Sequence, residues 1–194
     1  MTKVKDRKHY VIGAVFVICF VIGICTGAFM CAYTGDSINN SLKEYLSEFF
    51  AQFTNETNNF EVMKKSLCIN SKMFIVIFLA GFFGLGYIVC GLCMMVKGFV
   101  TGFTMAAFIK FYGVCGMWLA LSNIPMNIIL IPSLIFFCVV SAGMSANVHR
   151  RERHILGGYI ILSVIVYILL GISAAADGYI TTSIMKTVIQ NVIK

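Results

Sequence analysis

The fold is decided by the stretch Phe74–Asn147, whose sequence is FIVIFLAGFFGLGYIVCGLCMMVKGFVTGFTMAAFIKFYGVCGMWLALSNIPMNIILIPSLIFFCVVSAGMSAN. It contains no Asp and no Glu, and glycine recurs along its whole length. Two short segments, Met95–Gly98 and Ser122–Pro125, divide it into three apolar passes. An apolar run of about 20 residues is long enough for a helix to cross the hydrocarbon core of a bilayer. The stretch therefore predicts three transmembrane helices joined by two tight connections.

The composition of the whole chain also indicates a membrane protein. Of its 194 residues, 59% are hydrophobic and 12% are charged, whereas soluble domains contain about 25% charged residues. A chain of this length accommodates about five spans and one modest soluble segment, which leaves no room for a separate large catalytic domain. The net charge of +7 is concentrated at the ends of the expected spans, where positive residues set the orientation in the membrane. We therefore expect no nucleic-acid partner.

We predict an all-α fold, a single polytopic membrane domain over residues 1–194 with about five transmembrane helices. The expected spans are residues 11–33, 73–95, 98–121, 127–147 and 155–176, and residues 34–72 form an extracytoplasmic segment. A cleaved signal peptide is a weaker interpretation of the first span, because its apolar run exceeds the 7–15 residues of a signal core. A second alternative has four spans, with the third and fourth segments as a re-entrant pair.

Basic residues predict the orientation of these spans. Residues 1–10 carry four Lys or Arg against one acid, and residues 149–154 have the sequence HRRERH. The positive-inside rule places both clusters in the cytoplasm. Five crossings then leave the C-terminus outside the cytoplasm. Lys97, at the end of an expected span, is interpreted as a topology anchor that extends to the membrane surface.

The segment 34–72 contains an amphipathic helix. From Ile38 onward apolar residues recur at steps of three and four, which places them on one face of a helix. Tyr45, Phe49 and Phe53 belong to this stripe and are our candidates for binding a partner. The alternative is a helix that rests on the membrane surface or on the bundle.

Two charged residues lie within or beside the expected spans. Lys110 is near the middle of the third span, where a charge costs at least about 2.5 kcal/mol, so it should face the bundle or a pocket. Alternatively, the third span ends early and Lys110 reaches the interface. Asp177, near the outer end of the fifth span, is interpreted either as an acid at the outer interface or as a packing or coupling group within the bundle. Pro125 opens the fourth span, and Pro132 should bend it. Lys110, Asp177 and the bent helix support a second hypothesis, a small transporter or channel subunit.

Motifs for catalysis and metal binding are missing from the sequence. It contains no HExxH, no GxSxG and no GxxxxGK[ST]. Its three His lie on the cytoplasmic flanks, and most of its eight Cys lie in apolar spans, where a thiol packs as a small hydrophobe. Cys90 and Cys93 form a CxxC, but no second pair and no His accompanies them. We therefore expect no enzymatic activity, no metal and no cofactor.

Four features resemble the stage II sporulation protein M family, integral membrane proteins of endospore-forming bacteria. The first is a basic N-terminus followed by one span and a polar segment. The second is KGFVTG at Lys97–Gly102, which resembles the family's NGxxxG after span two. The third is PMNIILIPS at Pro125–Ser133, similar to Px[GN]xxx[IL]P[AS]. The fourth is ADGYIT at Ala176–Thr181, similar to an acid-centred Ex[FY]xTP.

The resemblance runs from about Tyr10 to Lys186, with departures at four positions. Lys97 stands where the family usually has Asn, and Thr182 replaces the final Pro. Met126 and Leu130 stand where wider relatives often have His and Glu.

The resemblance implies a non-enzymatic scaffold of engulfment, when the mother-cell membrane migrates around the forespore. The family is thought to tether two cell-wall-degrading partners, stage II sporulation proteins D and P, at the septum. It also implies a multi-pass protein of the septal or engulfing mother-cell membrane, in contact with membrane lipid. Small residues in the helices suit helix–helix contact, including contact within a homo-oligomer. The motif residues expected to act in helix packing are Gly98, Gly102, Pro125, Pro132 and Asp177.

Overall fold

The computed structural model describes residues 2–35, 39, 41–46, 48, 59–146 and 153–192. Within these ranges the chain is helical apart from short turns, and no strand is present. The elements are α1 (Thr2–Ala32), α3 (Asn59–Ala80), α4 (Gly86–Ser122), α5 (Ile124–Ala146), α6 (Arg153–Ala176), the π-helical turn η2 (Asp177–Thr181) and α7 (Thr182–Val192). Residues 39, 41–46 and 48 are also helical. The all-α prediction is confirmed.

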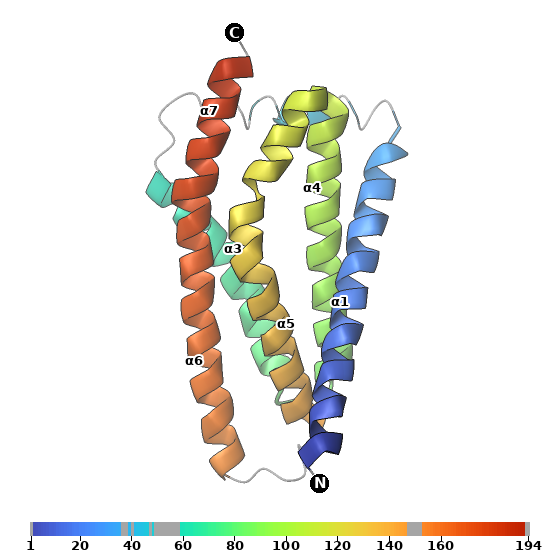
Figure 1. The fold of residues 1–194 in the computed structure, drawn as a ribbon, viewed down its shortest axis with the longest axis vertical. Coiled ribbons are helices and arrows are strands. Elements are labelled where there is room, and N and C mark those ends of the chain that lie inside the picture. Colours follow the sequence, from blue (N-terminus) through green and yellow to red (C-terminus); the bar gives the residue numbers. More distant parts are fainter. Residues whose placement is uncertain are drawn as a thin grey trace.

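The helices form an elongated bundle whose members run alternately up and down (Figure 1). The start of α1, the turn between α3 and α4, and the facing ends of α5 and α6 lie at one end, which we call the N-end. The turn between α4 and α5 and the helix α7 lie at the opposite end, the C-end. The two chain termini therefore lie at opposite ends of the bundle (Figure 1).

Four helical segments in the described part of the chain are long and apolar enough to cross a membrane. They are Tyr10–Ala32, Gly86–Ser122, Ile124–Ala146 and Leu156–Thr187. The expected number was about five. The helix α3 runs alongside the others but is not among the four, because its 22 residues include Glu61, Lys64, Lys65 and Lys72. The chain is therefore a polytopic α-helical membrane protein with one amphipathic member in its bundle.

The expected connection at Met95–Gly98 is wrong. These residues lie inside α4, which runs unbroken past them, and the chain instead turns at Gly81–Leu85. The expected spans 73–95 and 98–121 therefore have the wrong boundaries, because residues 73–80 belong to α3 and residues 86–95 belong to α4. The second expected connection is present, since Asn123 is the single residue between α4 and α5.

The break at Gly81–Leu85 is stabilised by side chains from distant helices. The last carbonyl groups of a helix have no partner within the helix. Here Ser141 of α5 donates a 2.8 Å hydrogen bond to the carbonyl oxygen of Ile77, and Tyr159 of α6 donates one of 3.0 Å to that of Phe78. These two hydrogen bonds allow α3 to end within an apolar environment.

The first backbone N–H group of α4 also forms a hydrogen bond with a side chain of another helix. The backbone N–H of Gly86 donates a 2.9 Å hydrogen bond to the Ser145 hydroxyl oxygen. A Cβ at position 86 would lie 2.6 Å from the Cβ of Ser145, so glycine is required for this approach. The polar side chains of α5 therefore position both sides of the turn.

The helices α1 and α4 pack through glycines on both partners. A Cβ at Gly98 would collide with the carbonyl oxygen of Phe20, and one at Gly102 with that of Ile24. Reciprocally, a Cβ at Gly23 would collide with the carbonyl oxygen of Met95, and a Cβ at Gly27 would collide with that of Phe99. Two GxxxG motifs thus face each other, the arrangement that lets membrane helices approach most closely.

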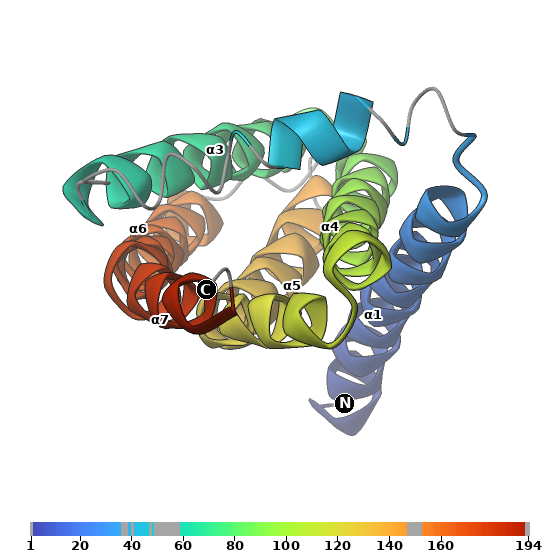
Figure 2. The same cartoon turned by 90° about the horizontal axis from the view of Figure 1, so that it is seen from above.

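Bends in α4 and α5 shape the C-end. Gly113 interrupts α4 with φ 55° and ψ −127°, a conformation that favours glycine. Seen from above, the chain after this point lies across the end of the bundle (Figure 2). Pro125 is in the first turn of α5, where a missing N–H has no consequence. Pro132 lies inside α5, which changes direction along its length in Figure 1.

The last expected span, 155–176, does not end the helix. The helix α6 continues through the π-helical turn η2 directly into α7. A π-helical turn is the common sign of an extra residue in a helix and occurs often at functional sites. In this chain it begins at Asp177.

A polar cavity between α3, α4 and the C-terminal helices

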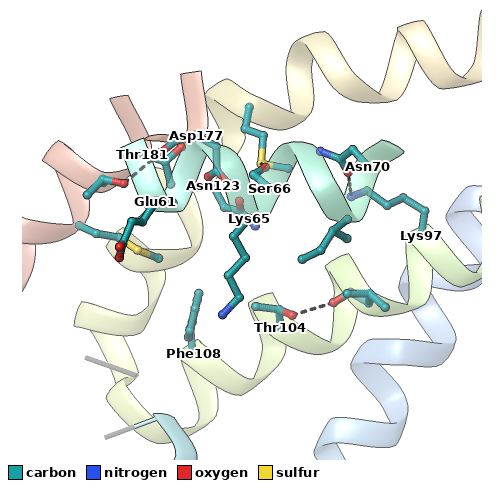
Figure 3. Close-up of a pocket in the computed structure, with 16 residues that line it drawn as sticks. Glu61, Lys65, Ser66, Asn70, Lys97, Thr104, Phe108, Asn123, Asp177 and Thr181 are labelled. Atoms are coloured by element: carbon teal, nitrogen blue, oxygen red, sulfur yellow. Dashed lines mark hydrogen bonds between the residues drawn. The ribbon is translucent and has the colours of Figure 1, made fainter. Parts of the chain in front are cut away.

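A cavity of about 440 Å³ lies where α3, α4, η2 and α7 meet (Figure 3). Its walls include the α4–α5 turn at Asn123 and the first residues of α5. The described residues that line it are Glu61, Val62, Lys65, Ser66, Ile69, Asn70, Lys97, Val100, Thr104, Phe108, Asn123, Met126, Asp177, Thr181, Thr182 and Met185. A cavity of this size is typical of small-molecule binding sites.

One side of the cavity is formed by Lys97 and Asn70. Lys97 Nζ donates a 3.3 Å hydrogen bond to Asn70 Oδ1 on α3 (Figure 3). Lys97 lies about 16 Å along α4 from Gly86, well inside the length of the helix. A charge at such a depth is unfavourable unless it faces the protein interior or water. The cavity satisfies this requirement, and the interpretation of Lys97 as an anchor at a helix end is wrong.

The other side of the cavity is formed by Asp177 and its neighbours. Asp177 is the first residue of η2 and lies beside Ser66 of α3 and Thr181 of the same turn. Gly178 follows, and a Cβ there would lie 2.7 Å from the backbone oxygen of Asn59. This close contact brings η2 against the start of α3 and carries Asp177 into the cavity.

Lys97 and Asp177 carry opposite formal charges, and both line the cavity. Their nearest neighbours on α3, Asn70 and Ser66, are four residues apart, which is roughly 6 Å along the helix. The cavity therefore has a positive side at Lys97 and a negative side at Asp177, and the α3 residues next to them differ by about one helical turn.

Two of the residues that line this cavity each have a buried polar atom with no hydrogen-bond partner among the described residues. These atoms are Nδ2 of Asn70 and Oγ1 of Thr181, and these residues are only 2% and 4% exposed. Leaving a buried polar group unpaired costs about 1–3 kcal/mol, so each such group requires an explanation, and a bound ligand is one. One of these atoms lies on each side of the cavity (Figure 3).

The structure does not bring Lys110 and Asp177 together. Lys110 Nζ donates hydrogen bonds of 2.8 Å to the Cys31 carbonyl oxygen, 3.4 Å to that of Ala32 and 2.9 Å to Asn39 Oδ1. Lys110 thus binds the last carbonyl groups of α1, a position where a positive charge is favourable. Phe108 lines the cavity. Lys110 follows two positions later on α4, so its side chain points away from the cavity.

The predicted partner-binding stripe is only partly within the described residues. Tyr45 is 64% exposed, and Leu46 beside it is 7% exposed and packs into a cluster with Cys31, Ala107 and Met185. The helical segment is therefore attached to the bundle by Leu46 and leaves Tyr45 at the surface. Phe49 and Phe53 lie outside the described residues.

The cavity was missed because its residues come from segments that appear unrelated in the sequence. Ser66 and Asn70 share one face of α3, but they lie in a stretch interpreted only as a polar connection. Lys97 lay at an expected helix end. The available signal was the spacing of Ser66 and Asn70 followed by an apolar run, which is typical of a helix with a polar face inside a membrane bundle.

Comparison with known proteins identifies the family. The family model of stage II sporulation protein M matches residues 16–182. The match includes two of the transmembrane candidates whole, most of the other two, and every described cavity-lining residue except Met185. No curated protein matches the chain. No solved structure matches it. The chain therefore belongs to the stage II sporulation protein M family and is a multi-pass membrane protein of sporulation.

Proposed function

We propose that this protein is a non-enzymatic membrane scaffold of sporulation engulfment. In this role it holds peptidoglycan-degrading partners, stage II sporulation proteins D and P, at the septal or engulfing mother-cell membrane. Membership of the family supports the sporulation setting. The partners and the scaffold role come from the family resemblance of the motifs at Lys97–Gly102, Pro125–Ser133 and Ala176–Thr181.

The observation that carries the proposal is the attachment of the segment after α1. Lys110 Nζ binds both the Cys31 carbonyl oxygen at 2.8 Å and Asn39 Oδ1 at 2.9 Å. Leu46 adds a buried apolar contact to the same region of the bundle. A segment held at two points presents Tyr45 in a fixed place, and pre-organisation of this kind lowers the entropic penalty of binding a partner.

The orientation in this proposal follows from the ends of the bundle. The basic N-terminal residues and the flanks of the HRRERH loop lie at the N-end, so the positive-inside rule assigns that end to the cytoplasm. Tyr45 and the α4–α5 turn are then outside the cytoplasm, on the side where the cell wall is remodelled.

The alternative hypothesis, a small transporter or channel subunit, relies on two charged residues, Lys110 and Asp177. Of these, Lys110 does not line the cavity. Lys110 is engaged by the end of α1 and by Asn39. Asp177 lines the cavity with Lys97 instead. The described structure therefore favours binding within the cavity over a pathway that uses Lys110.

A pull-down from a sporulating host tests the scaffold. The tagged protein is extracted in mild detergent, and co-purifying wall hydrolases are identified for the wild type and for the triple variant Tyr45→Ser, Phe49→Ser, Phe53→Ser. Tyr10→Ser is the matched control, because Tyr10 is also exposed but lies toward the N-end. We expect hydrolases with the wild type and the control and a strong loss with the triple variant. Equal recovery from all three proteins would reject the docking surface, and no recovery from any folded protein would reject the scaffold.

A further inference from the structure

The cavity beside Lys97 and Asp177 has the features of a binding site that the scaffold role does not use. Among its described lining residues, Lys65 and Lys97 balance Glu61 and Asp177 in formal charge. A guest with a net charge would leave one uncompensated charge inside the membrane bundle. A guest with one positive and one negative group would complete it, because each charge would face its opposite.

The polar atoms without partners match a dipolar guest. On the positive side, the Asn70 amide uses its Oδ1 to accept from Lys97 and leaves Nδ2 as a free donor. Lys97 and Asn70 Nδ2 together suit an anionic oxygen. On the negative side, Thr181 Oγ1 has no hydrogen-bond partner among the described residues, and Asp177 lines the same part of the cavity. A hydroxyl oxygen and a carboxylate together accept hydrogen bonds from an N–H group.

The separation of the two sides favours a particular spacing in the guest. The α3 residues on the two sides, Ser66 and Asn70, are four positions apart, which is roughly 6 Å along the helix axis. In an α-amino acid both charged groups are attached to one carbon, so they are closer together than the two walls of a site that spans about one helical turn. In ethanolamine phosphate two carbons and an ester oxygen separate the ammonium nitrogen from the phosphorus, which suits it better.

The wall also distinguishes a primary ammonium from a quaternary one. Proteins bind quaternary ammonium groups with cages of aromatic rings. Among the described residues that line this cavity, Phe108 is the one aromatic side chain. Asp177 and Thr181 instead offer hydrogen-bond acceptors, which only an ammonium with N–H groups can use.

We propose that the cavity binds a zwitterion of the ethanolamine phosphate type. Its phosphate lies at Lys97 and Asn70, and its primary ammonium lies at Asp177 and Thr181. The chemistry is the same for free phosphoethanolamine and for the headgroup of phosphatidylethanolamine. Val100, Met126 and Met185 form apolar wall that suits the carbon atoms of either source.

The test uses the full-length protein purified in a mild detergent and stripped of lipid. The midpoint of thermal unfolding, Tm, is measured as phosphoethanolamine is added, with phosphocholine as the matched control. We expect a saturable rise in Tm with phosphoethanolamine and none with phosphocholine, because a ligand that binds only the native state stabilises it. In parallel, the protein is placed in nanodiscs that contain phosphatidylethanolamine or phosphatidylcholine, and retained lipid is measured by native mass spectrometry.

Thr181→Val is the variant that separates binding from folding. Valine has nearly the same shape as threonine, and the Thr181 hydroxyl has no partner in the described structure. We therefore expect the ligand-free Tm to stay the same or rise, while the apparent affinity for phosphoethanolamine falls about tenfold. Lys97→Met should weaken binding further. Lys72→Met, which removes an exposed lysine of α3 outside the cavity, should leave affinity unchanged.

The outcomes distinguish the two sources. A response to free phosphoethanolamine supports a soluble ligand, and selective retention of phosphatidylethanolamine without such a response supports a lipid headgroup. Equal effects of the ethanolamine and choline compounds would overturn the proposal, as would no effect of any of them. An unchanged affinity of Thr181→Val would also overturn it.

Discussion

Lys110 Nζ of α4 donates a 2.8 Å hydrogen bond to the backbone carbonyl oxygen of Cys31 in the last turn of α1. The same ammonium group binds Asn39 Oδ1 at 2.9 Å. One side chain therefore terminates the first membrane helix and holds the start of the segment that follows. A charge that would be costly in lipid is stabilised here by a helix terminus.

Replacing Lys110 should loosen this junction. Lys110→Met leaves the Cys31 carbonyl group without its charged donor, so we expect the free energy of unfolding to fall by about 1–2 kcal/mol. The segment after α1 should also be cut faster in limited proteolysis. Unfolding in a detergent titration followed by circular dichroism measures the first effect. Lys72→Met is the control, and equal stability of the two variants would show that Lys110 does not cap α1.

The glycine contact between α1 and α4 should tolerate no added methyl group. Gly98→Ala would place a Cβ against the Phe20 carbonyl oxygen, and because both atoms belong to helix backbones the helices must separate. We expect a loss of about 2 kcal/mol or more. Gly91→Ala is the matched control on the same helix, since its Cβ would have Cys19 Sγ as nearest atom at 3.9 Å. The thermal midpoints of the two variants should differ clearly, and similar midpoints would refute the close packing.

The end of α3 should depend on the hydroxyl group of Tyr159. Tyr159→Phe keeps the ring, which stacks on Phe78 and Phe137, but leaves the Phe78 carbonyl oxygen without its donor. We expect destabilisation by about 1–3 kcal/mol, the cost of an unpaired buried acceptor. Tyr167→Phe is the comparison, because Tyr167 makes only a 3.4 Å exposed contact with Ser71 through its hydroxyl group. If both variants unfold alike, the capping role is wrong.

Lys97 and Asp177 should be coupled in stability. Removing one charge leaves the other without its electrostatic partner inside the bundle, whereas removing both leaves neither. We expect the double variant Lys97→Met, Asp177→Asn to lose less stability than the sum of its single variants, with a coupling of about 0.5–3 kcal/mol. A double-mutant cycle on the free energy of unfolding measures it. Strict additivity would mean that the two residues act independently.

The sequence predicts the membrane helices well where composition alone decides them. The turn at Ser122–Pro125 was found because Asn123 and Pro125 mark it locally. The break at Gly81–Leu85 was missed because the apolar run continues through it. What ends α3 there is a pair of hydroxyl groups from Ser141 and Tyr159, and contacts between residues so far apart in the chain have no local signal.

The site was predicted only in part for the same reason. Asp177 was selected as a group within the bundle, and it lines the cavity. Lys97 was assigned to a helix end because Gly98 follows it, but that glycine serves the contact with α1 and not a turn. One glycine can mark a turn or a close helix contact, and only the position of the neighbouring helix distinguishes the two.

The bend at Gly113 fixes how deeply the molecule sits in a bilayer. The straight part of α4, Gly86–Tyr112, is about 40 Å long, which already exceeds the hydrocarbon thickness of roughly 30 Å. Beyond the bend, the last turns lie across the bundle and expose Trp118, the only tryptophan of the chain, together with Met117 and Leu121. Tryptophan favours the boundary between lipid and water. We therefore expect the segment after Gly113 to lie at the membrane boundary, so that a change in bilayer thickness alters the tilt of the bundle more than the depth of this end.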